Sequence, residues 1–259
     1  MAATIDEAGS APIIRRISPE APWEWLAAGW RDLWCRPAIS LGYGLAAAAI
    51  GALLTVGLFY LDALPLALPL AAGFMLLGPM LAVGLYETSR CLAAGEPVET
   101  RRVILVATRS PAQLALLGGL LMLFMLAWVR VAMLLFALFF GLRDYPPLDQ
   151  WVPVLLFTYE GVAFLVVGIA VGGILAALVF AISVVSVPLL MVRDLDVVTA
   201  VLTSVRAVGR NPGPLLLWAW LIALLIAVGV ATLYVGLIIT FPLVGHATWH
   251  AFRALIETP

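Results

Sequence analysis

Long apolar runs separated by short polar segments constrain this chain more than any other feature. The runs fall at residues 39–60, 64–86, 112–129, 161–187, 215–231 and 235–255. Each comes close to the roughly 20 apolar residues that a helix needs to cross a bilayer. Because 64% of the residues are hydrophobic and only 11% are charged, a water-soluble fold could not cover its surface with polar groups. The sequence predicts an all-α, polytopic transmembrane helical bundle of about six spans.

Arginines indicate the orientation of these spans. All 14 basic residues are arginines, and they cluster between the apolar runs. If the amino terminus faces the cytoplasm, every arginine except Arg130 and Arg143 falls on the cytoplasmic side, as the positive-inside rule requires. Six spans then leave both termini in the cytoplasm. The first 20 residues have no apolar core, so we expect the first span to serve as the targeting signal.

Amphipathic segments near residues 19–36, 98–110 and 196–211 precede the first, third and fifth spans. In the first segment, Trp23, Trp30 and Trp34 recur at helical spacing. Tryptophan prefers the level of the lipid headgroups, so we expect this helix to lie in the interface plane with these three residues as anchors.

The third segment has a similar pattern. Asp196 is placed to cap it. We expect one face of this helix to point inward and the opposite face outward; the inward residues are Val198, Val201, Leu202, Val205 and Val208, and the outward ones are Thr199, Thr203, Arg206 and Arg210. An Asn-Pro pair ends the segment, as Arg-Pro and Ser-Pro end the other two.

The order of interfacial helix and helical hairpin occurs three times, which we interpret as a threefold internal repeat. Pro79, Tyr86 and Arg90 also have the spacing of Pro242, Trp249 and Arg253. The alternative is that such features occur in any polytopic protein. In either case, residues 18–256 form a single membrane domain, and residues 1–17 are expected to be a disordered cytoplasmic tail.

Several stretches of sequence are distinctive. They read PEAPWEWLAAGWRDLW, LLGPMLAVGLYETSR, FAISVVSVPLLMVRD, TAVLTSVRAVGRNPGPLLLWAW and FPLVGHATWHAFR. With these stretches, the chain from about Pro12 to Ile256 resembles the bacterial integral membrane family catalogued as domain of unknown function 2189. The resemblance implies a location in the bacterial inner membrane but no settled activity. Some members are labelled as cytochrome c oxidase subunits, yet this chain has only 2 histidines, too few for a haem-copper core.

The two histidines are the first candidates for chemistry. His246 and His250 stand four apart on the predicted last helix, so they share one face. Imidazole nitrogens bind zinc, copper and iron, and a metal or haem site is one interpretation. The stronger interpretation is packing or anchoring at the membrane interface, together with Trp249 and Arg253. No cofactor is therefore expected.

Arg130 and Glu160 are the second candidates, because charges at membrane depth are costly and are usually paired or functional. Both are predicted near the outer boundary, where they could form an ion pair or, less often, a gate. Residues 131–150 between them either extend the third helix or form a re-entrant segment.

Small residues form a third signal. Small residues repeat at a spacing of four in two spans, which lets helix backbones approach closely. They are Gly168, Gly172 and Ala176 in the fourth span, and Gly44, Ala48 and Ala52 in the first. We expect them to pack within the protomer, with a homodimer as the less favoured alternative.

Motifs of soluble enzymes are missing from the sequence: it has no phosphate-binding glycine loop followed by lysine, no HExxH and no GxSxG. We therefore expect no catalytic activity. The net charge of −1 also argues against a nucleic-acid partner, which needs a basic surface. The favoured function is an accessory subunit, assembly factor or scaffold of a membrane complex, with lipids and other subunits as partners. The alternatives are a permease or channel for a small or lipophilic solute, and a haem- or metal-binding protein.

Overall fold

The computed structural model describes residues 12–106, 108–141 and 148–257. Helices dominate this part of the chain. They are α1 (Ala21–Cys35), α2 (Pro37–Tyr60), the short 3-10 turn η1 (Leu64–Leu66), α3 (Ala67–Leu81), α4 (Val83–Ala94), α5 (Thr100–Ile104), α6 (Pro111–Phe140), α7 (Leu148–Phe157), α8 (Tyr159–Ser183), α9 (Ser186–Val192), α10 (Val197–Arg210), α11 (Pro212–Ala231) and α12 (Leu237–Leu255). The predicted all-α helical bundle is confirmed.

Five helical segments in the described residues are long and apolar enough to cross a membrane: 37–60, 67–94, 111–140, 159–192 and 212–231. The sixth predicted span corresponds to α12, which has 19 residues and is not among the five. Its second half carries polar side chains that are buried inside the protein. These polar residues lower the hydropathy of α12 although the protein, not lipid, surrounds them.

Each amphipathic segment leads into a hairpin through a residue that precedes proline. Arg36, Ser110 and Asn211 have nearly the same backbone conformation, with φ/ψ of −137/64°, −128/68° and −131/53°. A following proline disfavours the right-handed helical region for the residue before it. The interfacial helix therefore ends at Arg36 and Asn211, and at all three places the spanning helix begins with the proline.

Two predicted segments differ in the structure. The second interfacial helix, expected near 98–110, is only the five-residue α5. The tail expected to be disordered through residue 17 is ordered from residue 12. Ile14 forms an antiparallel bridge with Ile256, and the Ile17 amide donates to the Asn211 side chain at 3.0 Å. The rest of the tail, residues 1–11, lies outside the described residues.

The orientation expected for α10 is only partly right. Val201 and Val208 pack against the core and Arg206 and Arg210 are exposed, as expected, but Thr203 is buried and the other three valine and leucine positions face outward. Its apolar residues Val198, Leu202 and Val205 are 62%, 47% and 43% exposed. Its buried face consists of small residues, Ala200, Thr203, Ser204 and Ala207. These allow a close approach to the neighbouring helices, where the Ser204 hydroxyl accepts from the amide of Val185, just after the end of α8, at 3.1 Å. Val198, Leu202 and Val205 therefore point away from the protein, as on a helix lying on lipid.

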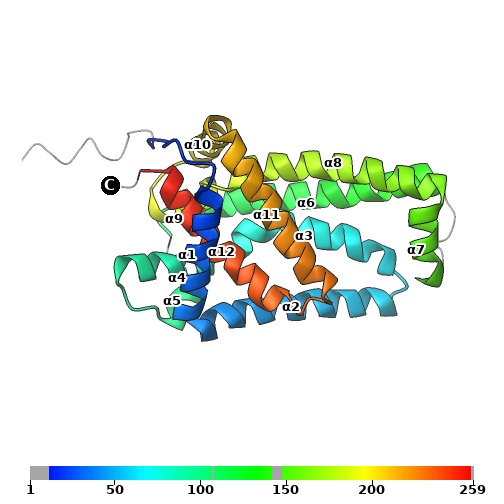
Figure 1. The fold of residues 1–259 in the computed structure, drawn as a ribbon, viewed down its shortest axis with the longest axis horizontal. Helices are drawn as coiled ribbons and strands as arrows, with labels where there is room; N and C mark the ends of the chain where they lie inside the picture. Colours follow the sequence, from blue (N-terminus) through cyan, green and yellow to red (C-terminus); the bar gives the residue numbers. More distant parts are fainter. Residues whose placement is uncertain (1–11, 107, 142–147, 258–259) are drawn as a thin grey trace, which may run out of the picture.

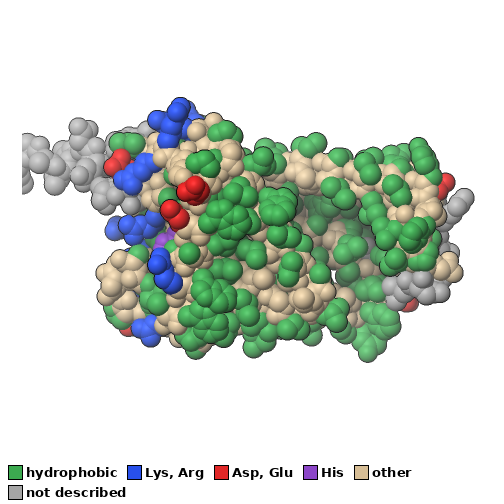
Figure 2. Space-filling view, viewed as in Figure 1, with side chains coloured by type: hydrophobic (Ala, Val, Ile, Leu, Met, Phe, Trp, Pro, Cys, Tyr) green, Lys and Arg blue, Asp and Glu red, His purple; other side chains and the backbone are tan. Residues whose placement is uncertain are grey.

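The molecule is elongated and its charges gather at one end (Figures 1 and 2). We call this the charged end; it holds both ends of the described chain, α1, α5, α9 and α10. The larger buried core also lies there and includes Trp25, Trp218 and Phe252. The α6–α8 pair extends to the opposite end, the far end, where α7 lies across it (Figure 1). Residues 131–140 are part of α6, so this portion of the open 131–150 segment extends the helix.

Candidate functional site

His246 lies at the centre of a buried polar network at the charged end. Its side chain is fully buried. The Ser40 hydroxyl of α2 lies 2.9 Å from Nε2, and the Ser89 hydroxyl of α4 lies 2.8 Å from Nδ1. A neutral imidazole has one donor and one acceptor, so one serine donates and the other accepts. The histidine thus joins α2, α4 and α12 through hydrogen bonds.

His250 connects the same helix to α1. Its Nε2 atom lies 2.8 Å from Oδ2 of Asp32, and the His250 side chain is 26% exposed. Burial by itself raises the pKa of the Asp32 carboxyl, but hydrogen bonds from His250 and Ser89 outweigh it, and the pKa lies below its usual value. His250 therefore holds the interfacial helix α1 to α12, while His246 joins helices within the bundle. No group of three metal-ligating side chains occurs among the described residues.

A second ionic cluster, which the sequence analysis missed, lies beside this network. Glu87 is 4% exposed and bonds Arg90 at 2.7 Å and Arg102 at 2.8 Å. Both arginines also reach Glu96 at 2.9 Å, and the hydrogen bond from Arg90 holds the pKa of the Glu96 carboxyl below its usual value. The spacing of Glu87 and Arg90 places them on one helix face, but Arg102 belongs to α5, and only the fold brings it there.

The expected interfacial anchors separate into two groups. Trp23, Trp30 and Trp34 are exposed on α1, and Arg253 is exposed on α12. Trp249, by contrast, is only 3% exposed, so it packs inside the protein and does not reach the headgroups. Helical spacing alone does not reveal which face of α12 the other helices cover.

Arg130 and Glu160 do not form the predicted pair. Both side chains are exposed, and the ion pairs found among the described residues do not join them. Glu160 lies in the first turn of α8, where the helix dipole favours a negative charge. Arg130 lies inside the continuous helix α6, with its side chain on the outer surface.

The small residues of α8 do not form one continuous contact with a single neighbouring helix. A Cβ on Gly172 would lie 2.8 Å from the Trp128 ring of α6, whereas one on Gly168 would meet nothing within 4 Å. Ala176 packs beside the second core cluster. A closer helix approach lies elsewhere: at Gly44 of α2 a Cβ would overlap the backbone of Ile238 in α12.

An apolar chamber lies between α2, α3, α8, α11 and α12. Its volume is about 540 Å³, and the surface is hollowed between α8 and α3 beside α11 (Figure 2). Apolar side chains such as Phe74, Phe180, Trp220 and Phe241 line it, and its described lining contains no charged residue. At 1.5 Å per residue, the lining from Leu216 to Val230 of α11 extends over about 21 Å. The chamber is therefore long, narrow and parallel to the helices.

Hydroxyl groups lie at the two ends of the chamber. Near the charged end, Thr248 donates to Val244 O at 2.8 Å, and Ser183 donates to Val179 O at 2.7 Å. At the other end of the chamber, which we call its far end, the hydroxyls of Thr55 and Tyr234 lie 2.7 Å apart. The chamber is thus apolar along its length, with hydroxyl groups at both ends.

Tyr234 reaches this position through an unusual turn. Leu233 and Tyr234 have φ values of 54° and 69°, a left-handed conformation that costs a non-glycine residue about 1–2 kcal/mol. The turn lays the Tyr234 ring against Gly51, where a Cβ would lie 2.6 Å from the ring. Strained residues of this kind often occur at functional sites. The sequence gives no signal for it, because neither residue is of a type that favours this conformation.

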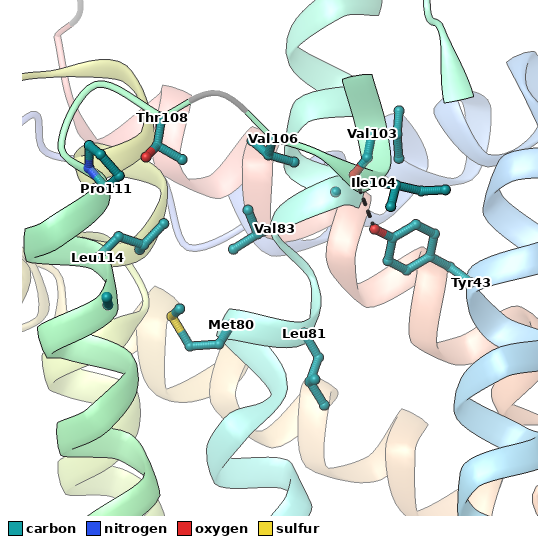
Figure 3. Close-up of a pocket in the computed structure, with 12 residues that line it drawn as sticks. Tyr43, Met80, Leu81, Val83, Val103, Ile104, Val106, Thr108, Pro111 and Leu114 are labelled. Atoms are coloured by element: carbon teal, nitrogen blue, oxygen red, sulfur yellow. Dashed lines mark hydrogen bonds between the residues drawn. The ribbon is translucent and has the colours of Figure 1, made fainter. Parts of the chain in front are cut away.

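A second, shallower pocket of about 400 Å³ lies nearer the charged end, between α2, α4, α5 and the start of α6. Figure 3 shows Met80, Val83 and Leu114 around it, with the Tyr43 hydroxyl donating to Val103 O at 3.3 Å. Its lining is mostly apolar and, in the described residues, uncharged.

Comparisons with known proteins point to a family but not to an activity. Neither the curated proteins nor the solved structures yielded a match. A family model does match, and it extends over residues 67–192, from α3 to the end of α9. The distinctive stretches around α1 and α10–α12 lie outside those residues. Through residues 67–192, the chain matches the family that it resembles, described as "Predicted integral membrane protein (DUF2189)".

Proposed function

We propose that this integral membrane protein has no catalytic activity of its own and binds a lipophilic molecule in the chamber, as a permease or carrier for it. The chamber is the observation that carries the proposal. Its volume of about 540 Å³ falls within the roughly 300–1,000 Å³ of small-molecule sites. Its apolar, uncharged lining suits a hydrocarbon chain and disfavours an ion.

The surroundings support the same function. The lining residues come from hairpins α2–α3 and α11–α12 and from α8, all of them in apolar surroundings where lipophilic molecules dissolve. Tyr86 of α4 and Thr248 of α12 line the chamber near the charged end, and Tyr234 of the α11–α12 turn lines its opposite end.

Photolabelling in lipid nanodiscs tests this proposal. The probe is an 18-carbon alkane with a diazirine at carbon 9, and labelled residues are mapped by mass spectrometry. We expect saturable labelling at lining residues such as Phe74 and Phe241. Labelling of the lipid-exposed α6 residues Leu123 and Leu134, which are 63% and 69% exposed, should rise linearly with probe and gives the background.

A pair of variants makes the test specific. Ala223 lines the chamber, whereas Ala227, one turn later on α11, does not. Ala223→Phe should reduce the saturable labelling several-fold because the ring occupies the chamber, and Ala227→Phe should leave it unchanged. Linear labelling of the lining residues in the unchanged protein would refute the proposal.

The α6–α8 pair favours a second candidate, an accessory subunit, assembly factor or scaffold. Leu134 and Leu138 of α6 and Ile169 of α8 are 69%, 76% and 73% exposed. The neighbouring Gly168 has open space beside it, which suits the close approach of a partner helix. Affinity purification in mild detergent should then recover a partner in fixed stoichiometry, and an Ile169→Arg variant should lose it.

We further propose that the charged end faces the cytoplasm, in the inner membrane of a bacterium. The arginines support this placement, because most of them gather at that end (Figure 2). The exposed tryptophans of α1 and the exposed apolar face of α10 would then lie on the inner leaflet.

A further inference from the structure

We infer that the chamber selects a chain-bearing amphiphile with an uncharged carbonyl group, which is held by the Thr55–Tyr234 hydroxyl pair at the far end. This inference rests on the proposed binding of a lipophilic molecule and specifies its chemistry.

The hydroxyl pair has a hydrogen-bond donor to spare. Each hydroxyl has one proton and two acceptor positions. The 2.7 Å bond between Thr55 Oγ1 and Tyr234 OH uses one proton, whichever group donates. The second proton has no acceptor in the hydrogen bonds found among the described residues. In apolar surroundings an unused donor is costly, so a ligand that offers an oxygen acceptor is favoured there.

Other hydroxyls along the chamber are not available in this way. Ser183 and Thr248 donate to carbonyls of their own helices, and the Tyr86 hydroxyl interacts with Thr248. The Trp220 indole also lines the chamber, but this residue is 58% exposed on the outside of α11. A hydrogen-bond acceptor on the ligand therefore gains the most binding free energy at the Thr55–Tyr234 pair.

The geometry of the pair fits an amphiphile that lies along the chamber. Thr55 is the nineteenth residue of α2, so it lies about 27 Å along that helix from Pro37, close to the far boundary of a bilayer core of about 30 Å. A carbonyl at this depth leaves the chain pointing toward the charged end, over the apolar lining. Because the lining has no cation, an uncharged carbonyl fits better than a carboxylate.

The turn supports a specific role for this pair. Two consecutive left-handed residues and the glycine under the ring hold Tyr234 against α2. A tyrosine that only filled space would not need its hydroxyl directed at Thr55. The strained turn thus fixes the donor in place before any ligand arrives, which reduces the entropy cost of binding.

Two probes of equal length test the inference. One is the diazirine alkane, and the other is the methyl ester of an 18-carbon acid with its diazirine at the same carbon. In the unchanged protein, the ester should half-saturate chamber labelling at a concentration about tenfold lower, as expected for one hydrogen bond. Diacyl phosphatidylcholine and an unlabelled single-chain methyl ester then serve as competitors, and the better competitor identifies a bilayer lipid or a free single-chain ester as the source. Failure of both would overturn the inference.

The double variant Thr55→Val/Tyr234→Phe removes both hydroxyls and keeps both shapes. In this variant, the ester and the alkane should half-saturate chamber labelling at the same concentration. The control Thr240→Val/Tyr60→Phe removes one threonine and one tyrosine hydroxyl from residues outside the described lining and should keep the tenfold preference. A preference that persists in the first double variant would overturn the inference.

The outcomes separate the two proposals. If neither probe labels the chamber saturably, the proposed function fails and the inference fails with it. If both probes saturate at the same concentration in the unchanged protein, the chamber binds lipophilic molecules, and only the inference fails. This comparison needs no variant, so it is decisive even if the double variant does not fold.

Discussion

At the scale of single residues, a few buried polar side chains determine how the charged end is held together. Ser40 and Ser89 lie on two different helices, and each is hydrogen-bonded to His246 on a third helix, away from water. Each such bond contributes modestly, but removing one partner leaves the other groups unpaired, which costs more than the bond provides. The free-energy cost of removing the histidine therefore exceeds the free energy that its hydrogen bonds contribute to stability.

Replacing His246 with leucine should lower the free energy of unfolding by about 2–4 kcal/mol, because two buried hydroxyls lose their partner. Thermal unfolding in detergent measures this loss. The double variant His246→Leu/Ser40→Ala should recover part of it, because one of the unpaired hydroxyls is gone. Equal melting temperatures for His246→Leu and the unchanged protein would show that the network does not stabilise the fold.

Asp32 gives a pH-dependent prediction. Its pKa is lowered in the folded protein, so its stabilising contribution is present above the unfolded pKa of about 3.9. That contribution is lost as the pH falls through the lower, folded value. Asp32→Asn should therefore reduce the melting temperature at pH 7 and make a smaller difference below about pH 4. Glu24→Gln, an exposed change on the same helix, is the control. A difference that stays constant down to about pH 3 would contradict the assignment.

At the scale of helices, glycine positions decide how closely the hairpins pack. Gly44 of α2 lies against the backbone of α12, and Gly51 lies under the ring of Tyr234. The small-residue spacing in the sequence indicated Gly44 and Ala48 correctly as packing residues, and both are buried. It also suggested Ala52, which is exposed. A spacing of four follows one helix face only approximately, and Gly51 lies nearer the line of contact.

Gly44→Ala should destabilise the protein by about 1–3 kcal/mol, because its Cβ would overlap the Ile238 carbonyl and push α2 away from α12. Gly42→Ala is a matched control on the same helix, since its Cβ would meet nothing within 4 Å. This control should be neutral or slightly stabilising because alanine favours a helix. Melting temperatures of the two variants measure the difference, and similar losses in both would contradict the close contact.

Helix boundaries followed from the sequence where local chemistry sets them. Proline starts α2, α6 and α11 close to the predicted places, because it suits the first turn of a helix and disfavours a helical conformation for the residue before it. The face that each helix presents was harder to predict. For α10 the sequence pattern identified an apolar stripe but not its direction, since a membrane makes an outward apolar face as favourable as an inward one. Hydropathy alone cannot distinguish lipid from protein as the partner.

At the scale of the whole molecule, the sequence predicted the class and the spanning segments because the bilayer imposes them on composition and length. It did not predict the chamber, the His246 network or the Glu87 cluster. Those depend on which helices become neighbours, and in an apolar bundle many neighbours have similar composition. The chemically informative residues, such as Ser40, Thr55 and Tyr234, each look ordinary in the sequence, and only the fold places them together.

The orientation of the molecule gives the last prediction, and the two cysteines make it measurable. Cys35 is exposed at the charged end, whereas Cys91 is buried, so one native thiol reports on that end. The Leu233 side chain is 83% exposed in the α11–α12 turn, and Leu233→Cys in a Cys35→Ser background gives a reporter for the far end. In intact spheroplasts, a membrane-impermeant maleimide should label this Leu233→Cys variant, and it should leave Cys35 of the unchanged protein unlabelled. Because a closed membrane shields only the inner face, Cys35 should become reactive once the membrane is opened with detergent. Labelling of Cys35 in intact spheroplasts would place the charged end outside and would contradict the positive-inside assignment.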